Sequence, residues 1–503
     1  MSSSTRTARR AAALLTALAL VAGGAVAAPK TEKVKGDAAR PFPPSYITIE
    51  GHKQVKPDDW KDPRLCGQCH TVQYEGWNGS MHSNAFRDPV FQALWALGEK
   101  ADPVMRNHCG ACHTAIGTAT ETVEFVPSMG VHGGFKAPEV AEQGVGCDVC
   151  HTIAGTNINK TAVLEHGNSS YVVAPGKTKR AGLADAKSPY HDTMKSDHHT
   201  KSDFCGNCHN IFHPTNNFPI ERTYDEWKYS IYSQNGIQCQ DCHMVPVELA
   251  NKVADTMTRP ENMPDSPLEG FAALSGPLRK VVHSHGFIGG NAVIVKALGK
   301  DKVEKYEDVG RDKNYDEAVK RLKSAASLKV FMARKGDDPL HELTVKVMNE
   351  RAGHHLPTSL TEVRQIWIEA VVTDDQGREL FRNGTLDANN EVPKDAVVFN
   401  AHAVDKNGQA TQLPWEITRF TDVNTIPPKG YKYARYYFNV PADAKSLKVV
   451  AKLHYRSFAQ QLADILLGKG AVTVPSVEMV ALEEAVDLQE LQTASAGAAA
   501  EKH

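Results

Sequence analysis

Cys66-Gly-Gln-Cys69-His70 is the first of five copies of one short motif, Cys-x-x-Cys-His, that lie between residues 66 and 243. The other copies are Cys109-Gly-Ala-Cys112-His113, Cys147-Asp-Val-Cys150-His151, Cys205-Gly-Asn-Cys208-His209 and Cys239-Gln-Asp-Cys242-His243. Together the copies use all ten cysteines of the 503-residue chain. This stretch therefore decides how the rest of the sequence is interpreted.

Cys-x-x-Cys-His is the attachment motif of c-type haem. Two thiols add to the two vinyl groups of one haem, and the next histidine then lies under the iron as its proximal ligand. Zinc sites and thioredoxin-like motifs also use Cys-x-x-Cys, but they do not need a histidine after each pair. Disulfides between i and i+3 would be strained. The copies therefore predict five covalently bound haem c groups, with the proximal ligands His70, His113, His151, His209 and His243.

The N-terminal residues have the composition of a secretory signal. Residues 1–27 contain Arg9-Arg10, an apolar run over 11–21 and a small-residue cleavage site at Ala25-Val26-Ala27. The alternative is an uncleaved membrane anchor, for which the apolar run is short. Export agrees with haem attachment outside the cytoplasm and predicts a periplasmic, outer-membrane-associated or extracellular protein. Residues 28–61 contain many prolines and lysines and are expected to form an extended lead-in or linker.

The charge balance argues against one class of partner. The formal net charge of the chain is -2, and haem propionates would make the holoprotein more acidic. A nucleic-acid partner is therefore not expected.

Aromatic residues follow the first motif at helical spacing. Tyr74, Trp77 and Met81 predict a helix after the haem attachment. The whole pattern, Cys-x-x-Cys-His-x-x-x-Tyr-x-x-Trp-x-x-Ser-x-His over residues 66–82, resembles the opening of the cytochrome c-552/c-554 family of multihaem cytochromes. The likeness continues at Gly144-Val-Gly-Cys-Asp-Val-Cys-His, at Tyr224-Asp-Glu-Trp227 and at His283-Ser-His285-Gly-Phe-Ile-Gly-Gly-Asn291.

This resemblance covers about residues 62–291, which we expect to form a pentahaem cytochrome domain. It implies a mostly helical scaffold in which haems stack in close pairs and pass electrons along the stack. It also implies that several irons carry a second histidine, and some members of the family keep one haem five-coordinate.

Histidines outside the motifs are numerous enough to supply every distal position. The chain has 22 histidines, of which five belong to the motifs. The polar stretch 156–200 is expected to be a loop-rich insert whose His166 and His191 lie at the surface. The candidates for distal ligands are His82, His108, His132, His199, His213, His283, His285 and His354.

The second half of the chain has a different pattern. Residues 292–326 predict a helical connector, and from residue 327 apolar residues alternate with period two between turn signals. Residues 327–483 therefore predict an all-β sandwich of immunoglobulin-like kind, without a cysteine for an inter-sheet disulfide. Residues 484–503 are a low-complexity tail. The predicted fold is a mostly helical and loop-rich haem domain followed by this sandwich.

One motif of the second half resembles a signature of multihaem cytochromes. Gly353-His354-His355-Leu-Pro357-Thr358 is similar to a Gly-His-x-Leu-Pro-Thr sequence in their C-terminal domains, although Ser359 replaces the usual following glycine. The resemblance would place His354 or His355 against the haem domain, as an iron ligand or a propionate partner. The alternative is a β-turn with two solvent-exposed histidines.

Three functions are compatible with this sequence. The first is an electron carrier of anaerobic or extracellular respiration, because two histidines on each iron leave no open position for a substrate. Its partners would be a membrane quinol-oxidising cytochrome and a terminal reductase or outer-membrane conduit. The second is an oxidoreductase that acts on nitrite, hydroxylamine or sulfite at one five-coordinate haem, although a Cys-x-x-Cys-Lys haem is not present. The third is a subunit of an oligomer or filament. We expect an electron carrier rather than an enzyme.

Overall fold

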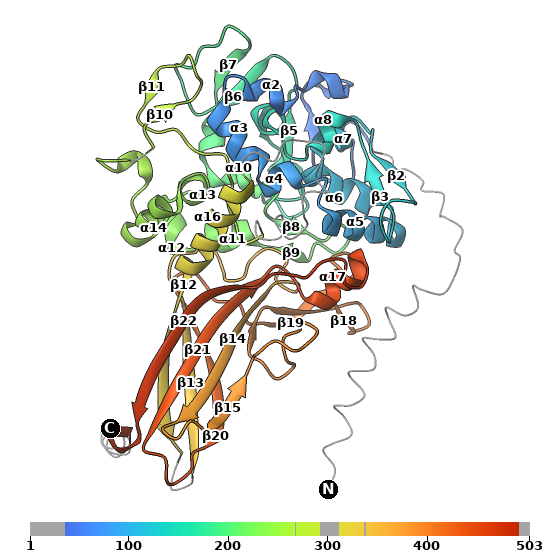
Figure 1. Cartoon of the computed structure of the whole chain (residues 1–503). Helices are drawn as coiled ribbons and strands as arrows, with labels where there is room; N and C mark the ends of the chain where they lie inside the picture. The colour runs from blue at the N-terminus through green and yellow to red at the C-terminus, as the bar shows by residue number, and fades with distance from the viewer. Residues whose placement is uncertain (1–35, 267, 292–310, 336–338, 492–503) are drawn as a thin grey trace.

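The computed structural model describes residues 36–266, 268–291, 311–335 and 339–491. The predicted signal sequence and part of the predicted connector lie outside these residues. The described chain forms a helical and loop-rich region above an elongated β-region (Figure 1). The expected division into a helical haem region and an all-β C-terminal region is confirmed.

Short helices dominate the first region because each Cys-x-x-Cys-His motif needs only one or two turns. The helices of this region are α2 (Pro63–Gly67), α3 (Thr71–Asn78), α4 (Met81–Asn84), α5 (Pro89–Ala101), α6 (Met105–His113), α7 (Ala115–Ala119), α8 (Glu139–Glu142), α9 (Cys147–His151), α10 (Ser202–Gly206), α11 (Thr223–Lys228), α12 (Ile231–Gln234), α13 (Cys239–His243) and α14 (Val247–Thr256). The helix expected after the first motif is α3.

Two of the motifs share one local architecture. Tyr74 and Trp77 follow the first motif with ring centroids 5.9 Å apart, and Tyr224 and Trp227 follow the fourth with ring centroids 5.6 Å apart. In both cases the tyrosine ring covers the glycine of the motif, where a Cβ atom would lie 2.6 Å from a ring atom. The glycine therefore allows the aromatic side chain to pack directly on the attachment helix.

Of the segment expected to be a linker, residues 28–61, the described residues 36–61 pack into the helical region. Ile47 and Trp60 are buried in a cluster that also contains Tyr171. Strand β1 (Thr48–Ile49) pairs in parallel with β5 (Tyr171–Val173), which in turn pairs with β4 (Ile153–Thr156). The prolines and lysines of the segment hid this packing in the sequence, because only a few of its apolar residues reach the core.

Short strand pairs hold the remaining loops of the helical region. They are β2 (Glu124–Val126) with β3 (Gly134–Lys136), β6 (Thr178–Ala181) with β7 (Asp192–Lys195), β8 (Ile211–Phe212) with β9 (Pro219–Glu221), and β10 (Gly270–Phe271) with β11 (Leu278–Arg279). The β6–β7 pair orders the end of the polar insert and thereby fixes the position of His191.

The β-region consists of two sheets packed face to face. One sheet has the order β12-β13-β20, and the other has the order β15-β14-β21-β22 with β16 beside β14. Alternate residues of both sheets, among them Val345, Ile368 and Leu453, are fully buried in one cluster. The strands are β12 (Ala326–Arg334), β13 (Leu340–Asn349), β14 (Gln365–Asp374), β15 (Glu379–Asn383), β16 (Val398–Phe399), β20 (Tyr431–Asn439), β21 (Ser446–Arg456) and β22 (Val477–Asp487).

Several elements join the two regions. Helix α16 (Arg311–Ala325) enters β12 directly and packs against β22, and helix α17 (Gln460–Leu467) packs on α5. A small sheet with the order β18-β17-β19 lies near β8 and β9 (Figure 1). Its strands are β17 (Ala401–Val404), β18 (Ala410–Thr411) and β19 (Arg419–Val423). The predicted start of the tail at residue 484 falls inside β22.

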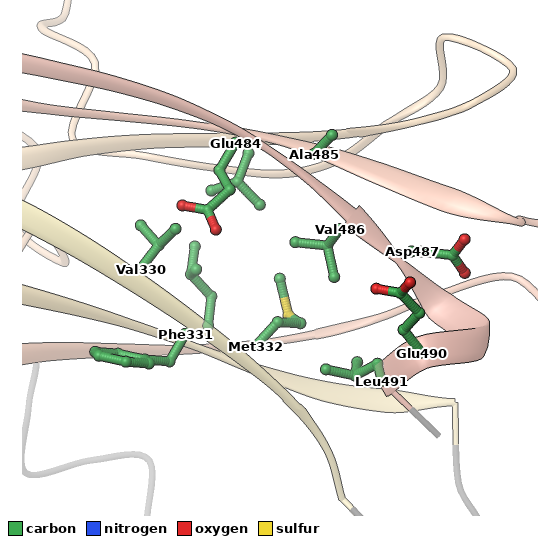
Figure 2. Close-up of a pocket in the computed structure, with 11 residues that line it drawn as sticks. Val330, Phe331, Met332, Glu484, Ala485, Val486, Asp487, Glu490 and Leu491 are labelled. Atoms are coloured by element: carbon green, nitrogen blue, oxygen red, sulfur yellow. The ribbon is translucent and has the colours of Figure 1, made fainter. Parts of the chain in front are cut away.

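A cavity of about 280 Å³ with a mixed apolar and acidic lining lies between the edge strands β12 and β22 (Figure 2). Val330 and Met332 line one side, and Val486 and Leu491 line the other. No motif residue lines this cavity, so it is separate from the haem region.

Candidate haem centres

Each of the five motifs places its two cysteines on one helical turn. The motifs lie on α6, α9 and α13 or run out of the C-terminal ends of α2 and α10. All ten cysteines are partly buried and none forms a disulfide. Residues at i and i+3 share one face of a helix, so both sulfur atoms of a motif can reach the same haem.

The proximal histidines are oriented as metal-binding imidazoles. Four of them have Nδ1 within 2.6–2.8 Å of a backbone carbonyl oxygen. These pairs are His70 with Ala272, His113 with Ala85, His151 with Arg180, and His243 with Ile288. An Nδ1–H group that donates to an oxygen fixes the tautomer and leaves Nε2 for a metal. The motif residues therefore fit haem c.

His209 has a carboxylate as its orienting group. Its Nδ1 lies 3.5 Å from Oε1 of Glu221, which is buried at the end of β9. Burial would lower the pKa of His209, but the hydrogen bond and charge of Glu221 outweigh it, so the pKa is raised. Burial lowers the pKa of His113 to about 4 and that of His243 to about 3, so both imidazoles are neutral, as an iron ligand must be.

Haem 1 to haem 5 denote the groups expected at the five motifs in chain order. Two imidazoles on opposite sides of one metal have ring centroids roughly 6–6.5 Å apart, because each nitrogen lies about 2 Å from the metal. Four proximal histidines have a second histidine ring at this separation. The pairs are His70 with His191 at 6.4 Å, His151 with His285 at 6.2 Å, His209 with His82 at 6.1 Å, and His243 with His354 at 6.1 Å.

His151 has a second neighbour at similar distance. The ring of His199 lies 6.0 Å from that of His151, but both of its nitrogens are engaged. Nδ1 is 2.9 Å from Oγ of Ser196, and Nε2 is 3.0 Å from the carbonyl oxygen of Cys150. His285 uses only Nδ1, toward the carbonyl oxygen of His283 at 3.3 Å. The hydrogen bonds therefore favour His285 as the partner of His151.

His113 of haem 2 differs from the other four proximal histidines. Among the residues that the structure describes, no histidine ring lies opposite it at the separation of the other pairs. The ring of Phe91, from α5, stacks on His113 instead, with centroids 3.6 Å apart and planes inclined by 5°. Phe91 has no group that can bind iron, so the described part of the chain offers no histidine as a second ligand opposite His113.

The other distal candidates lie away from the proximal rings. Nε2 of His132 is 2.8 Å from the carbonyl oxygen of Ile465 in α17, and Nε2 of His213 is 2.9 Å from that of Trp415. These two histidines tie the haem region to the β-region. His108 and His283 each have a buried Nδ1 without a partner in the described structure, and neither ring contacts a proximal histidine.

His191 is the residue that sequence reasoning overlooked. It was expected at the surface of the polar insert, yet its ring faces His70, and its Nδ1 is 3.1 Å from the carbonyl oxygen of Asp192. The sequence around it, Pro-Tyr-His-Asp, has no apolar period that would indicate a buried position. Only the pairing of β6 with β7 brings this histidine to the first motif.

His354 comes from the β-region, and its ring lies 6.1 Å from that of His243. The preceding turn and the following Leu356-Pro357 pair hold it at the junction, and its Nδ1 is 2.9 Å from the carbonyl oxygen of His355. Glu226 of α11 receives hydrogen bonds from the backbone N–H of His355 at 3.1 Å and from Oγ1 of Thr358 at 2.5 Å. The signature around His354 therefore docks the β-region onto the haem region.

Contacts between thiols of different motifs show which motifs are neighbours. Cys66 contacts Cys147, Cys112 contacts Cys208, and Cys205 contacts Cys239. Cys150 also lies within electrostatic reach of Cys208 and Cys205. The motifs therefore adjoin in the order 1, 3, 4 and 5, with motif 2 beside motif 4.

The comparisons with known proteins agree with this geometry. Residues 65–152 match the family model described as cytochrome c554 and c-prime. The fold is similar to that of a penta-heme cytochrome c552 from Thermochromatium tepidum, with a TM-score of 0.57 and 17% identity over 86% of this chain and 100% of that chain. A second solved structure, the Northeast Structural Genomics Consortium target SoR45, aligns at 11% identity over 32% of this chain and 87% of that chain. Its TM-score of 0.15 is too low to indicate a shared fold.

No curated protein is similar enough to this chain to count as a match. The family match and the shared fold confirm the resemblance to multihaem cytochromes c. The family match over residues 65–152 supports covalent haem c and a role in electron transfer. Within the described residues, no helix is both long enough and apolar enough to cross a bilayer.

Proposed function

We propose that this multihaem cytochrome c carries five haems and passes electrons along four bis-histidine irons. One observation carries the proposal: four proximal imidazoles, each held by an oxygen acceptor at Nδ1, face a second imidazole at 6.1–6.4 Å. Two imidazoles on one iron give a low-spin, six-coordinate centre that suits electron transfer. The distal ligands proposed are His191, His285, His82 and His354, for haems 1, 3, 4 and 5.

The thiol contacts support a route for the electrons. Haem 1 would adjoin haem 3, haem 3 would adjoin haem 4, and haem 4 would adjoin haem 5. Haem 2 would branch from haem 4, because Cys112 contacts Cys208. Electrons could then enter near one end of this series and leave near the other without passing through haem 2.

The cell compartment and the partners complete the proposal. An N-terminal stretch with signal-like composition and the covalent haem support an exported protein, in the periplasm or at the outer membrane. A membrane quinol-oxidising cytochrome would supply electrons in respiration, and a terminal reductase or outer-membrane conduit would receive them. The haem region provides the redox chemistry and the β-region provides the docking or assembly surface.

The β-region supports an immunoglobulin-like classification by its strand order. Along the chain, the strands of the two large sheets, apart from the short β16, are β12, β13, β14, β15, β20, β21 and β22. The first, second and fifth of these form one sheet, β12-β13-β20. The third, sixth and seventh lie in the other, with β15 at its edge. Immunoglobulin-like sandwiches divide their strands between sheets in a similar way. The segment with β16 to β19 would take the place of the strand that usually precedes the fifth.

The first experiment is low-temperature electron paramagnetic resonance of the oxidised, haem-loaded protein, integrated by spin state. We expect four low-spin haems and one high-spin haem. Five low-spin haems would contradict the open position at haem 2, while two or more high-spin haems would contradict one of the proposed histidine pairs.

A second function is favoured by the open position opposite His113. A small nitrogen or sulfur compound could bind at haem 2 and exchange electrons with the other haems. Nitrite, hydroxylamine and sulfite are the compounds to test, as ligands that convert the high-spin signal to a low-spin one. If none of them changes the high-spin signal, this second function is excluded and the electron-carrier function is unaffected.

A further inference from the structure

The outer face of the sheet β12-β13-β20 carries a group of exposed aromatic side chains. Tyr431, Tyr433 and Tyr437 of β20 and Phe331 of β12 are each 44–53% exposed. The register of the three strands places all four on one side of the sheet, opposite the apolar cluster of the β-region. Exposed apolar patches are uncommon on single chains, and aromatic residues are enriched where proteins bind one another.

The same face carries more positive than negative charge. Its strands place Lys329, Lys346 and Arg435 there, with one acid, Glu342. The guanidinium carbon of Arg435 lies 5.7 Å from the ring centroid of Tyr433. We call this surface, with the aromatic residues above, the basic aromatic face. Because the chain as a whole has a net charge of -2, the face is a local reversal of charge and fits an acidic surface.

A surface with acidic and apolar groups is present on the same β-region. It is the cavity of about 280 Å³ between β12 and β22, which Val330, Met332 and Val486 line with apolar groups. Glu484 and Glu490 also line it, and Figure 2 shows the Glu484 carboxylate in the space between the two strands. Since a cavity of about 150 Å³ can hold a benzene ring, this cavity has room for an aromatic side chain.

The basic aromatic face and the cavity lie on different sides of the sandwich. They share β12, whose Val330 and Met332 line the cavity, whereas the ring of Phe331 between them is directed away from it (Figure 2). Strands β12 and β22 also form the edges of their sheets in the described chain, and edge strands offer unpaired backbone groups to a partner. One copy of the chain can therefore use both surfaces at once.

We propose that the basic aromatic face of one copy of this chain docks on the cavity of a second copy. Tyr433 lies between Lys346, its cross-strand neighbour, and Arg435. Its ring would enter the cavity, and the two cations would meet Glu484 and Glu490. The contact joins two different surfaces, so it is head-to-tail and can continue from copy to copy. This inference rests on the assembly role proposed for the β-region and is independent of the haem ligands.

The test is sedimentation velocity of the haem-loaded protein over a series of concentrations. The parent should sediment faster as its concentration rises, and this association should weaken in about 1 M salt, where the Debye length is about 3 Å. Tyr433→Glu removes the ring and brings an acid to the acidic cavity, and Glu484→Lys brings a cation to the basic aromatic face. Each variant should weaken the association at least about tenfold.

A mixture of the two variants tests the head-to-tail arrangement. Tyr433→Glu keeps an intact cavity and Glu484→Lys keeps an intact face, so an equimolar mixture should form dimers and nothing longer. Two controls make the same changes of charge elsewhere. Tyr229→Glu replaces an exposed tyrosine of the haem region, and Glu483→Lys replaces the residue beside Glu484, whose Oε1 is 2.7 Å from Nζ of Lys448. Both controls should associate as the parent does.

The outcomes separate this inference from the proposed electron transfer. If the parent is a monomer at every concentration, the inference is excluded, while the spin count of the haems still tests the electron carrier. Association that both variants retain, or a mixture that stays monomeric, would contradict the head-to-tail contact. Association only after deletion of residues 492–503 would mean that the chain's own C-terminal segment occupies the cavity, which also contradicts it. Haem content and the spin-state spectrum show that each variant is folded.

Discussion

Single hydrogen bonds decide which histidines are available to iron. The rings of His199 and His285 lie at almost the same distance from that of His151, yet both ring nitrogens of His199 are hydrogen-bonded, to Ser196 and Cys150. At the junction, position rather than hydrogen bonding distinguishes the adjacent His354 and His355, since each has Nδ1 engaged. Nδ1 of His355 is 2.8 Å from Oγ1 of Thr425, and only the ring of His354 faces a proximal histidine.

The first prediction separates these two neighbours. His354→Ala should convert haem 5 from low spin to high spin, because the sixth ligand is removed while His243 remains. Integrated electron paramagnetic resonance should then show one more high-spin haem than the parent. His355→Ala is the matched control and should leave the spin count unchanged; the reverse result would assign the ligand to His355.

The second prediction concerns the ligand that the sequence did not indicate. His191→Ala should add one high-spin haem, since its ring lies 6.4 Å from that of His70. The same spectra measure the effect. His402→Ala, an exposed position on β17, serves as the control. An unchanged low-spin count in His191→Ala would mean that haem 1 has another sixth ligand.

At the scale of elements, short segments hold the two regions together. The turn after β13 places Thr358 beside both Thr223, at 2.8 Å between the Oγ1 atoms, and Glu226 of α11. Helix α17 accepts a contact from His132, and Lys429 in the turn before β20 donates to the carbonyl oxygen of Ala254 at 3.0 Å. These contacts are polar and directional, so they help to set the orientation of the β-region, beside the apolar cluster that Val90 of α5 shares with Val363 and Leu462.

The third prediction tests this junction. Glu226→Ala removes the acceptor of the His355 N–H and of the Thr358 hydroxyl, both partly buried. We expect the free energy of unfolding to fall by about 1–3 kcal/mol, measured by denaturant titration. Glu416→Ala, which removes an exposed acceptor of Thr411, should change it by less than about 0.5 kcal/mol. Equal effects of the two substitutions would contradict a special role of the junction.

At the scale of the whole molecule, two kinds of core meet along one boundary. The β-region has a single large apolar cluster, whereas the helical region has several small ones around the motifs. Haems bound at the five motifs would add apolar surface to these small clusters.

The fourth prediction concerns how the stability of the fold depends on pH through Glu362, a buried carboxyl group of the β-region. Glu362 has a pKa of about 8 in the folded chain, against an ordinary value of 4.5. The folded state therefore binds the proton more tightly, and the stabilisation is complete below about pH 4.5 and is lost as the pH rises to about 8. Glu362→Gln should remove up to a few kcal/mol of this decline. Thermal unfolding between pH 5 and 9 measures it; Glu369→Gln should retain the decline, and the same slope in Glu362→Gln would contradict the prediction.

The sequence by itself determined the covalent chemistry of this protein. Attachment of haem c depends on residues that are neighbours along the chain, so the cysteines, the proximal histidines and the helix after the first motif were all predictable. The β-region was predictable for the same reason, because period-two alternation is a local pattern. The packing of residues 36–61 was not predictable, since their few apolar side chains find their partners within residues 111–173.

Tertiary structure alone decided which histidines face one another. His191 and His70 are 121 positions apart, and His354 and His243 are 111 positions apart. No periodicity relates residues so distant in the chain. Their meeting depends on a strand pair in the polar insert and on the docking of the β-region. The lack of a second histidine opposite His113 in the described chain has the same origin, because it depends on which elements the fold brings near that residue.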